Sequence, residues 1–173
     1  MRKSVISVGL SEASLTKALK ELTYYKRDLE AKAKKLRHRI AEKMANYSRG
    51  GFAGAIVDDL VNGTPRQAEV NVSVTDSGDV TLVIADGEDA VWVEFGAGVY
   101  NNGSVGTSPH PSGNDLKFTI GTYGKGMGSR NVWGFYEDGE LYLTHGTPAV
   151  MPMYNAVKTV CAEIDNIARE VFG

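Results

Sequence analysis

The residues best suited to chemistry are a carboxylate in an apolar setting and two imidazoles further along the chain. Glu94 lies between Val93 and Phe95, and His110 and His145 follow it. A carboxylate and an imidazole in contact can move protons or activate a nucleophile. The sequence therefore leaves open a small hydrolase that uses Glu94 with His110 or His145. That alternative requires the side chains to converge in one pocket, within about 10 Å of each other.

A structural or interface ion pair is the interpretation that we favour for Glu94. Its carboxylate either faces water at an edge or is buried against a base such as Lys125 or Arg130. The acidic run from Asp86 to Asp89 is more simply a solvated turn. His110 stands between two prolines, and we expect it to be exposed.

No motif in the chain predicts a metal or a nucleotide. None of the three histidines has a second His or Cys at the spacing of zinc ligands. The glycines from Gly121 to Gly128 lack the Lys-Ser or Lys-Thr pair that completes a phosphate loop. No apolar run approaches the roughly 18 residues of a membrane span. We therefore expect no cofactor, no small-molecule substrate and no membrane partner.

The chain is expected to form a single domain, residues 1–173, with a flexible glycine-rich loop inserted at residues 97–131. This stretch is too polar and too rich in glycine to bury itself, and loops longer than about 15 residues usually serve a function. Contact with another chain is the function that we predict for it. The predicted interaction residues are Glu94, Tyr123, Gly124, Lys125, Gly126, Gly128 and Arg130.

The net charge of −2 conceals an asymmetry along the chain. Basic residues dominate positions 1–49, whereas acidic residues dominate positions 50–173. Such a distribution favours electrostatic contact between the two parts, either within one subunit or between neighbours. It also leaves open a nucleic-acid-binding module that uses the basic stretch from Lys32 to Arg39.

The periodicity of apolar residues predicts an α+β fold, with a long N-terminal helix, a small antiparallel β-sheet of hairpins and a C-terminal helix packed on the sheet. Ser11 is a suitable N-cap for the first helix, and Gly50-Gly51 is expected to end it. A short helix is predicted over Phe52–Val61, while Ala90–Phe95 permits either a strand or a helical turn. The remaining predicted elements are hairpins over residues 70–84 and 133–143 and a helix that starts near Pro152.

Two short motifs on either side of the loop carry a resemblance to a known family. The first is Val93-Glu94-Phe95-Gly96, and the second is His145-Gly146-Thr147-Pro148-Ala149, followed by Pro152 and Ala156. Together with the glycine-rich loop and the aromatic hairpin between them, they resemble the bacteriophage tail-component family. These are head–tail joining, neck or tail-completion proteins of long-tailed phages. The resemblance covers most of the chain from Ser11 onward.

The resemblance implies a structural protein of the virion and no enzymatic activity. Its members assemble into rings at the head–tail junction, so the implied partners are copies of the chain itself, connector proteins, and tail-tube or terminator proteins. DNA that passes through such a ring would be in passive contact with it. The resemblance also implies a protein that is assembled in the cytoplasm of a bacterial host and ends in the virion.

Overall fold

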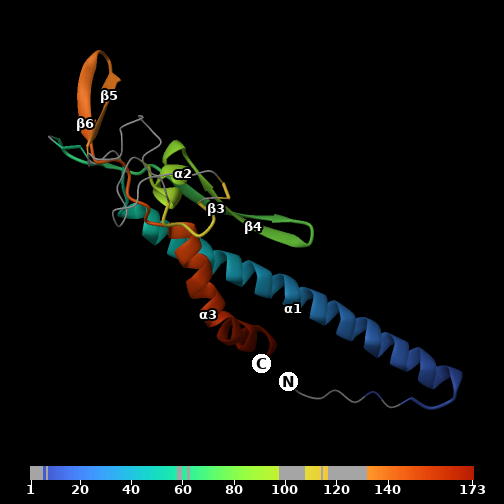
Figure 1. Cartoon of the computed structure of the whole chain (residues 1–173). Coiled ribbons are helices and arrows are strands. Elements are labelled where there is room, and N and C mark those ends of the chain that lie inside the picture. Colours follow the sequence, from blue (N-terminus) through green and yellow to red (C-terminus); the bar gives the residue numbers. More distant parts are fainter. Residues whose placement is uncertain are drawn as a thin grey trace.

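The computed structural model describes residues 6, 8–57, 60–61, 63–97, 108–113, 115–116 and 132–173. The long helix, antiparallel hairpins and C-terminal helix within these residues confirm the predicted α+β class (Figure 1). In chain order the elements are α1 (Glu12–Ala53), β1 (Ile56–Val57), β2 (Arg66–Gln67), β3 (Asn71–Ser77), β4 (Val80–Asp86), α2 (Glu88–Phe95), β5 (Trp133–Glu137), β6 (Glu140–Thr144) and α3 (Pro152–Phe172).

Helix α1 begins where the sequence predicts and ends later. The side chain of Ser11 accepts a hydrogen bond from the backbone N–H of Ser14, which caps the first turn. The helix then runs for 42 residues, or about 63 Å at ~1.5 Å per residue. The predicted end at Gly50-Gly51 is wrong, because α1 continues through both glycines to Ala53.

The predicted short helix over Phe52–Val61 is also wrong. Phe52 and Ala53 belong to α1, and Ile56–Val57 pairs antiparallel with Arg66–Gln67 as β1 and β2. Phe52 is almost completely buried, so the last turn of α1 is held by tertiary packing. Such packing overrides the weak helix propensity of the two glycines before it.

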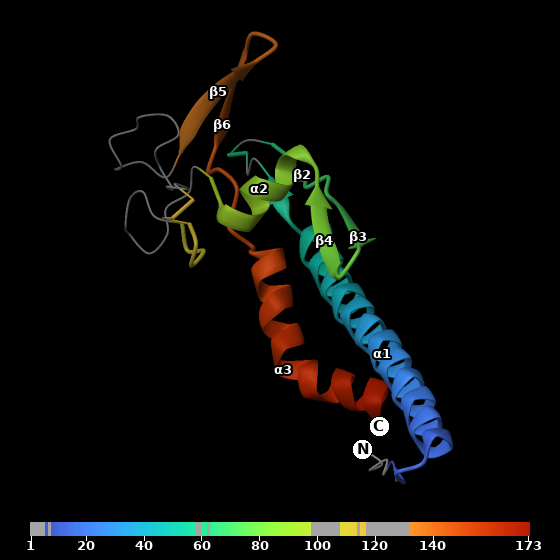
Figure 2. The ribbon, with the colours of Figure 1, turned by 90° about the vertical axis from the view of Figure 1, so that its right-hand side faces the viewer.

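Strands β3 and β4 form the first predicted hairpin and lie along α1 (Figure 2). Val72 and Val74 pair with Ala85 and Val83, and this face packs toward the core. Because side chains alternate along a strand, the apolar residues at the other positions of β4 face outward. These outward residues are Val80, Leu82 and Ile84, and all three are exposed.

Strands β5 and β6 form the second predicted hairpin, which extends away from the rest of the molecule (Figures 1 and 2). Its base is attached where Leu60 bridges Thr144 and the N–H of Val61 donates to the carbonyl of Leu143. The hairpin and the N-terminal end of α1 lie at opposite ends of the molecule (Figure 2).

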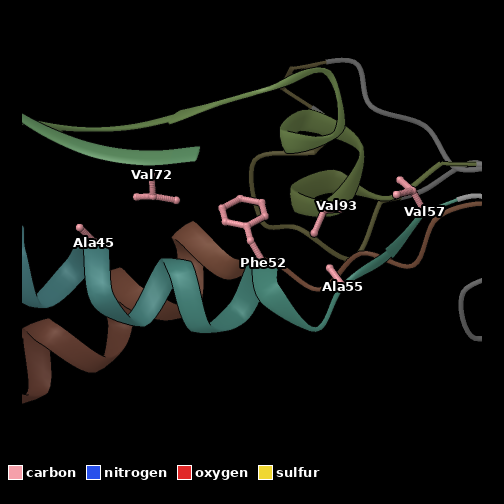
Figure 3. Packing of buried hydrophobic residues seen from close by; sticks show 6 residues of the cluster. All are labelled: Ala45, Phe52, Ala55, Val57, Val72 and Val93. Carbon is pink, nitrogen blue, oxygen red and sulfur yellow. The ribbon is translucent and has the colours of Figure 1, made fainter. Parts of the chain in front are cut away.

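Helix α3 begins at Pro152, as predicted, and its most extensive contact is with α1. The apolar core lies where the end of α1, the inner face of β3 and helix α2 come together (Figure 3). Its fully buried members are Ala45, Phe52, Ala55, Val57, Val72 and Val93. Most of these side chains are small, so this core is modest for a chain of 173 residues.

Candidate functional site

The two sequence motifs meet in space and form a junction between α2 and α3. Ala97 and Thr147 exchange backbone hydrogen bonds of 2.9 and 2.7 Å as an isolated antiparallel bridge. The carbonyl of Val93 accepts from the N–H of Val150 at 2.9 Å and from that of Met151 at 3.3 Å. We call this contact between residues 93–97 and 147–154 the α2–α3 junction.

Two small residues allow the backbones to approach at the junction. Gly96 has φ +79°, a conformation that favours glycine, and a Cβ there would lie 3.0 Å from the Cβ of Ala149. Gly96 of the first motif and Ala149 of the second are therefore closely packed.

Glu94 is the central polar residue of the junction. Its side chain is buried, with 7% of its surface exposed, and its two oxygens accept hydrogen bonds from the first turn of α3. The N–H of Met153 donates to Oε2 at 2.8 Å, and the N–H of Tyr154 donates to Oε1 at 2.9 Å. A carboxylate in this position satisfies amides that have no partner within the helix and interacts favourably with the helix dipole.

Glu94 therefore caps the N-terminus of α3 from a distant position in the chain. Met151, at the N-cap position itself, has a left-handed backbone conformation and makes no side-chain capping bond. A buried Glu94 was one of the two predicted placements, with Lys125 or Arg130 as its expected partner. Both of these residues lie outside the described part of the chain. Since Glu94 is buried, its contribution to any contact with another chain is indirect, through the position of α3.

His110 completes the surroundings of Glu94. Its Nε2 lies 3.2 Å from Glu94 Oε1, and its Nδ1 accepts a hydrogen bond of 3.0 Å from the N–H of Ser112. The ring packs on Phe95 at 4.4 Å and meets Tyr154 edge-on at 5.2 Å. The expectation that His110 is exposed is wrong, because these aromatic and polar contacts leave 9% of its side chain accessible.

Ser108 fixes the segment that carries His110. Its hydroxyl donates to the carbonyl of Phe95 and accepts from the N–H of His110 at 3.2 Å. Residues 108–113 are thus attached to the junction through Ser108 and His110. The contact of His110 with Glu94 is one of the two pairings that the sequence left open, whereas the bond of Ser108 to the carbonyl of Phe95 had no signal in the sequence.

The geometry meets one requirement of the hydrolase alternative, since Glu94 and His110 are in contact. Both ring nitrogens of His110 are nevertheless engaged, Nδ1 by the N–H of Ser112 and Nε2 by Glu94. A general base needs a free nitrogen directed at the group that it deprotonates. The hydroxyl of Ser108 is directed to a backbone carbonyl instead. We therefore assign the Glu94–His110 pair a role in joining elements.

A second buried carboxylate fixes the start of α2. The guanidinium of Arg66 binds both oxygens of Asp89 at 2.8 and 2.9 Å, and the N–H of Glu69 donates to Asp89 at 2.9 Å. The hydrogen bond from Arg66 holds the pKa of Asp89 below its ordinary value. The prediction of a solvated acidic turn holds for Asp86 and Glu88, which are exposed, and is wrong for Asp89.

The C-terminal half of the basic helix finds acidic partners within the same chain. Lys43 contacts Glu163 of α3 at 2.7 Å, and Arg39 contacts Glu170 at 3.0 Å. His38 lies 3.6 Å from Asp76 at the β3–β4 turn. The hydrogen bonds from Lys43 and Tyr47 lower the pKa of Glu163. The contact of Arg39 with Glu170 reduces the charge that the Lys32–Arg39 stretch offers to a phosphate backbone.

In the N-terminal half of α1, the ion pairs among the described residues are confined to the helix itself, Lys26 with Glu30 and Lys32 with Asp28. The predicted apolar stripe of α1 is half-buried from Leu36 onward, where α3 lies alongside. Before that point its leucines are exposed, and these are Leu15, Leu19, Leu22 and Leu29. This part of α1 therefore extends beyond its contact with α3.

The structure does not describe the other predicted interaction residues. Tyr123, Gly124, Lys125, Gly126, Gly128 and Arg130 all lie outside the described residues, as does most of the predicted loop at 97–131. Within the described part of the chain, no group of three His, Cys, Asp or Glu side chains could hold a metal ion. No helix among the described residues is long and apolar enough to cross a membrane.

Comparisons of the chain with protein-family models, with curated proteins and with solved structures gave no match.

Proposed function

We propose that this chain is a structural protein of a phage virion, placed at the head–tail junction as a neck or tail-completion component. It acts by forming a ring of identical subunits that docks on connector and tail-tube or terminator proteins. The proposal combines the resemblance of the two motifs to the tail-component family with the surface of the described residues.

The observation that carries the proposal is the exposure of large apolar side chains at both ends of one molecule. Leucines lie exposed along the N-terminal half of α1, and Tyr136, Leu141 and Leu143 lie exposed on the β5–β6 hairpin. Extended apolar surfaces of this kind mark sites of contact with other proteins. Two separate surfaces at opposite ends suit a subunit that has a neighbour on each side.

The chemistry of the α2–α3 junction supports the same proposal. Glu94 and His110 are occupied in holding α3 and residues 108–113 against α2. A rigid junction of this kind fixes the direction in which the two helices leave it. We propose that its function is to keep the two end surfaces at a constant distance and orientation.

Co-expression with the products of adjacent genes tests the proposed function. The chain is purified alone and together with the proteins encoded on either side of its own gene, and each sample is examined by electron microscopy. We expect rings, or stacked complexes in which the chain lies between connector and tail proteins. Neighbouring genes that encode no phage structural proteins, together with an absence of any complex, would contradict the proposal.

A further inference from the structure

The β5–β6 hairpin carries an apolar face that is exposed among the residues that the structure describes. Tyr136 pairs with Leu141, and Gly134 pairs with Leu143, so these four residues lie on one face of the hairpin. Tyr136 is 75% exposed and Leu141 is 54% exposed. An isolated two-stranded hairpin is marginally stable in water, and an additional apolar contact is needed to hold it. This hairpin therefore has the properties of an element that is completed by a partner.

The tip of the same hairpin is acidic. Glu137, Asp138 and Glu140 are all exposed at the turn between β5 and β6. Among the residues that the structure describes, no Lys, Arg or His side chain lies within ion-pair distance of these three carboxylates. A partner for this hairpin should thus combine apolar side chains with positive charge.

The N-terminal half of α1 offers that combination. A shallow hollow of about 370 Å³ is lined by Thr16, Leu19, Lys20, Thr23, Tyr24 and Arg27. Leu19 is 64% exposed and Tyr24 is 76% exposed, so apolar groups are available beside the two cations. A second hollow, of about 520 Å³, shares Thr16 and Lys20 with the first and adds Lys17 together with one carboxylate, Glu12. In the described part of the chain, Lys17, Lys20 and Arg27 have no acidic side chain within ion-pair distance.

The two surfaces lie at opposite ends of the molecule, separated by most of the length of α1 (Figures 1 and 2). They therefore cannot satisfy each other within one subunit. We infer that the β5–β6 hairpin of one copy docks on residues Thr16–Arg27 of α1 in the next copy. Tyr136 and Leu141 would contact Leu19 and Tyr24, while the acidic tip would face the cations.

This contact is heterologous, because it joins two different surfaces of identical chains. Such contacts propagate from copy to copy and close into a ring when the rotation between neighbours permits it. The inference rests on the proposed function and specifies the self-contact that the ring requires. It also assigns a role to the part of α1 that extends beyond α3.

Charge reversal on each side of the contact tests the inference by measurement of self-association. We expect Lys20→Glu/Arg27→Glu and Glu137→Lys/Glu140→Lys each to raise the concentration at half-association by about tenfold or more. A chain with all four substitutions should recover association, because both sides of every contact are reversed. The variant Lys35→Glu/Arg169→Glu, at exposed sites elsewhere, changes the net charge as Lys20→Glu/Arg27→Glu does and is the matched control for that variant. Equal weakening by the control, or no recovery in the fourfold variant, would overturn the inference.

Cross-linking between unlike variants tests the geometry. In a Cys161→Ser background, Leu19→Cys and Leu141→Cys are placed in separate chains, which are mixed and treated with a short bismaleimide. We expect covalent dimers in the mixture and none in either variant alone. Dimers of like chains only, or no dimers at all, would overturn the inference. If rings with connector and tail proteins still formed in that case, the proposed function would stand and only this contact would be wrong.

Discussion

At the scale of single residues, Glu94 links the two motifs more directly than any other side chain. It accepts hydrogen bonds from the N–H groups of Met153 and Tyr154 and contacts His110. Its apolar neighbours made burial foreseeable from the sequence. Its contact with His110 was one pairing that the sequence left open, but the two amide partners were not foreseeable, because backbone amides at a helix start leave no side-chain pattern in the sequence.

Replacement of Glu94 should reduce the stability of the fold. Glu94→Ala leaves two half-buried amides of α3 and the His110 ring without their acceptor, so we expect a loss of about 2–4 kcal/mol in the free energy of unfolding. Glu94→Gln keeps one acceptor oxygen and should lose about 1–2 kcal/mol. Denaturant unfolding measures both values.

The control for this prediction is Glu88→Gln, because Glu88 belongs to the same helix and is exposed. We expect that variant to unfold within about 0.5 kcal/mol of the parent protein. Unchanged stability of Glu94→Ala would show that the carboxylate does not fix α3, and the proposed role of the junction would fail with it.

Asp89 should make the stability of the fold depend on pH in the acid range. Because Arg66 holds the pKa of Asp89 below 3.8, its ordinary value, the ionised form is favoured in the folded chain. This stabilisation is complete above that ordinary value and is lost as the pH falls through the lower, folded pKa. Asp89→Asn should therefore lower the melting temperature at pH 7 and lessen its fall below about pH 4.

Thermal unfolding at a series of pH values measures this effect. Asp86→Asn serves as the control, since Asp86 is exposed at the end of β4. A curve for Asp89→Asn that runs parallel to that of the parent protein would exclude Asp89 as a source of the acid sensitivity. The Arg66–Asp89 pair itself was not predictable, because its members are 23 positions apart and the whole β3–β4 hairpin lies between them.

At the scale of elements, the sequence predicted the helix starts and hairpins that depend on residues close together in the chain. Ser11 at the start of α1, the alternating hairpins and Pro152 at the start of α3 all follow from short-range sequence signals. The residue at which α1 ends does not follow from such signals, because α1 there packs against Pro152 at the start of α3, which is distant along the chain. A Cβ on Gly51 would lie 2.8 Å from the Cβ of Pro152, whereas a Cβ on Gly50 would meet nothing.

These two neighbouring glycines provide a matched pair of variants. Gly50→Ala should raise the free energy of unfolding by about 0.5–1 kcal/mol, because alanine favours the helix and the site is open. Gly51→Ala should instead lower it by about 1–3 kcal/mol, because the rigid ring of Pro152 cannot move away without displacing α3. Equal effects at both positions, measured by denaturant unfolding, would contradict the close contact between α1 and α3.

At the scale of the whole molecule, the sequence predicted the fold class and a long first helix but not which faces stay exposed. Val80, Leu82 and Ile84 alternate as a core-facing strand would, yet the register with β3 turns them outward. The charge asymmetry was visible, but only the structure separates the cations that α3 and the β3–β4 turn neutralise from those that remain available. Lys43 belongs to the first group and Lys20 to the second.

The mass of the purified protein in solution tests the central claim most directly, namely that this chain works through contact with copies of itself. Native mass spectrometry over a range of concentrations should show one discrete oligomer whose mass is a whole multiple of 18.6 kDa. A closed ring predicts that this number of subunits stays constant as the concentration rises. A mass of 18.6 kDa at every concentration would contradict the claim.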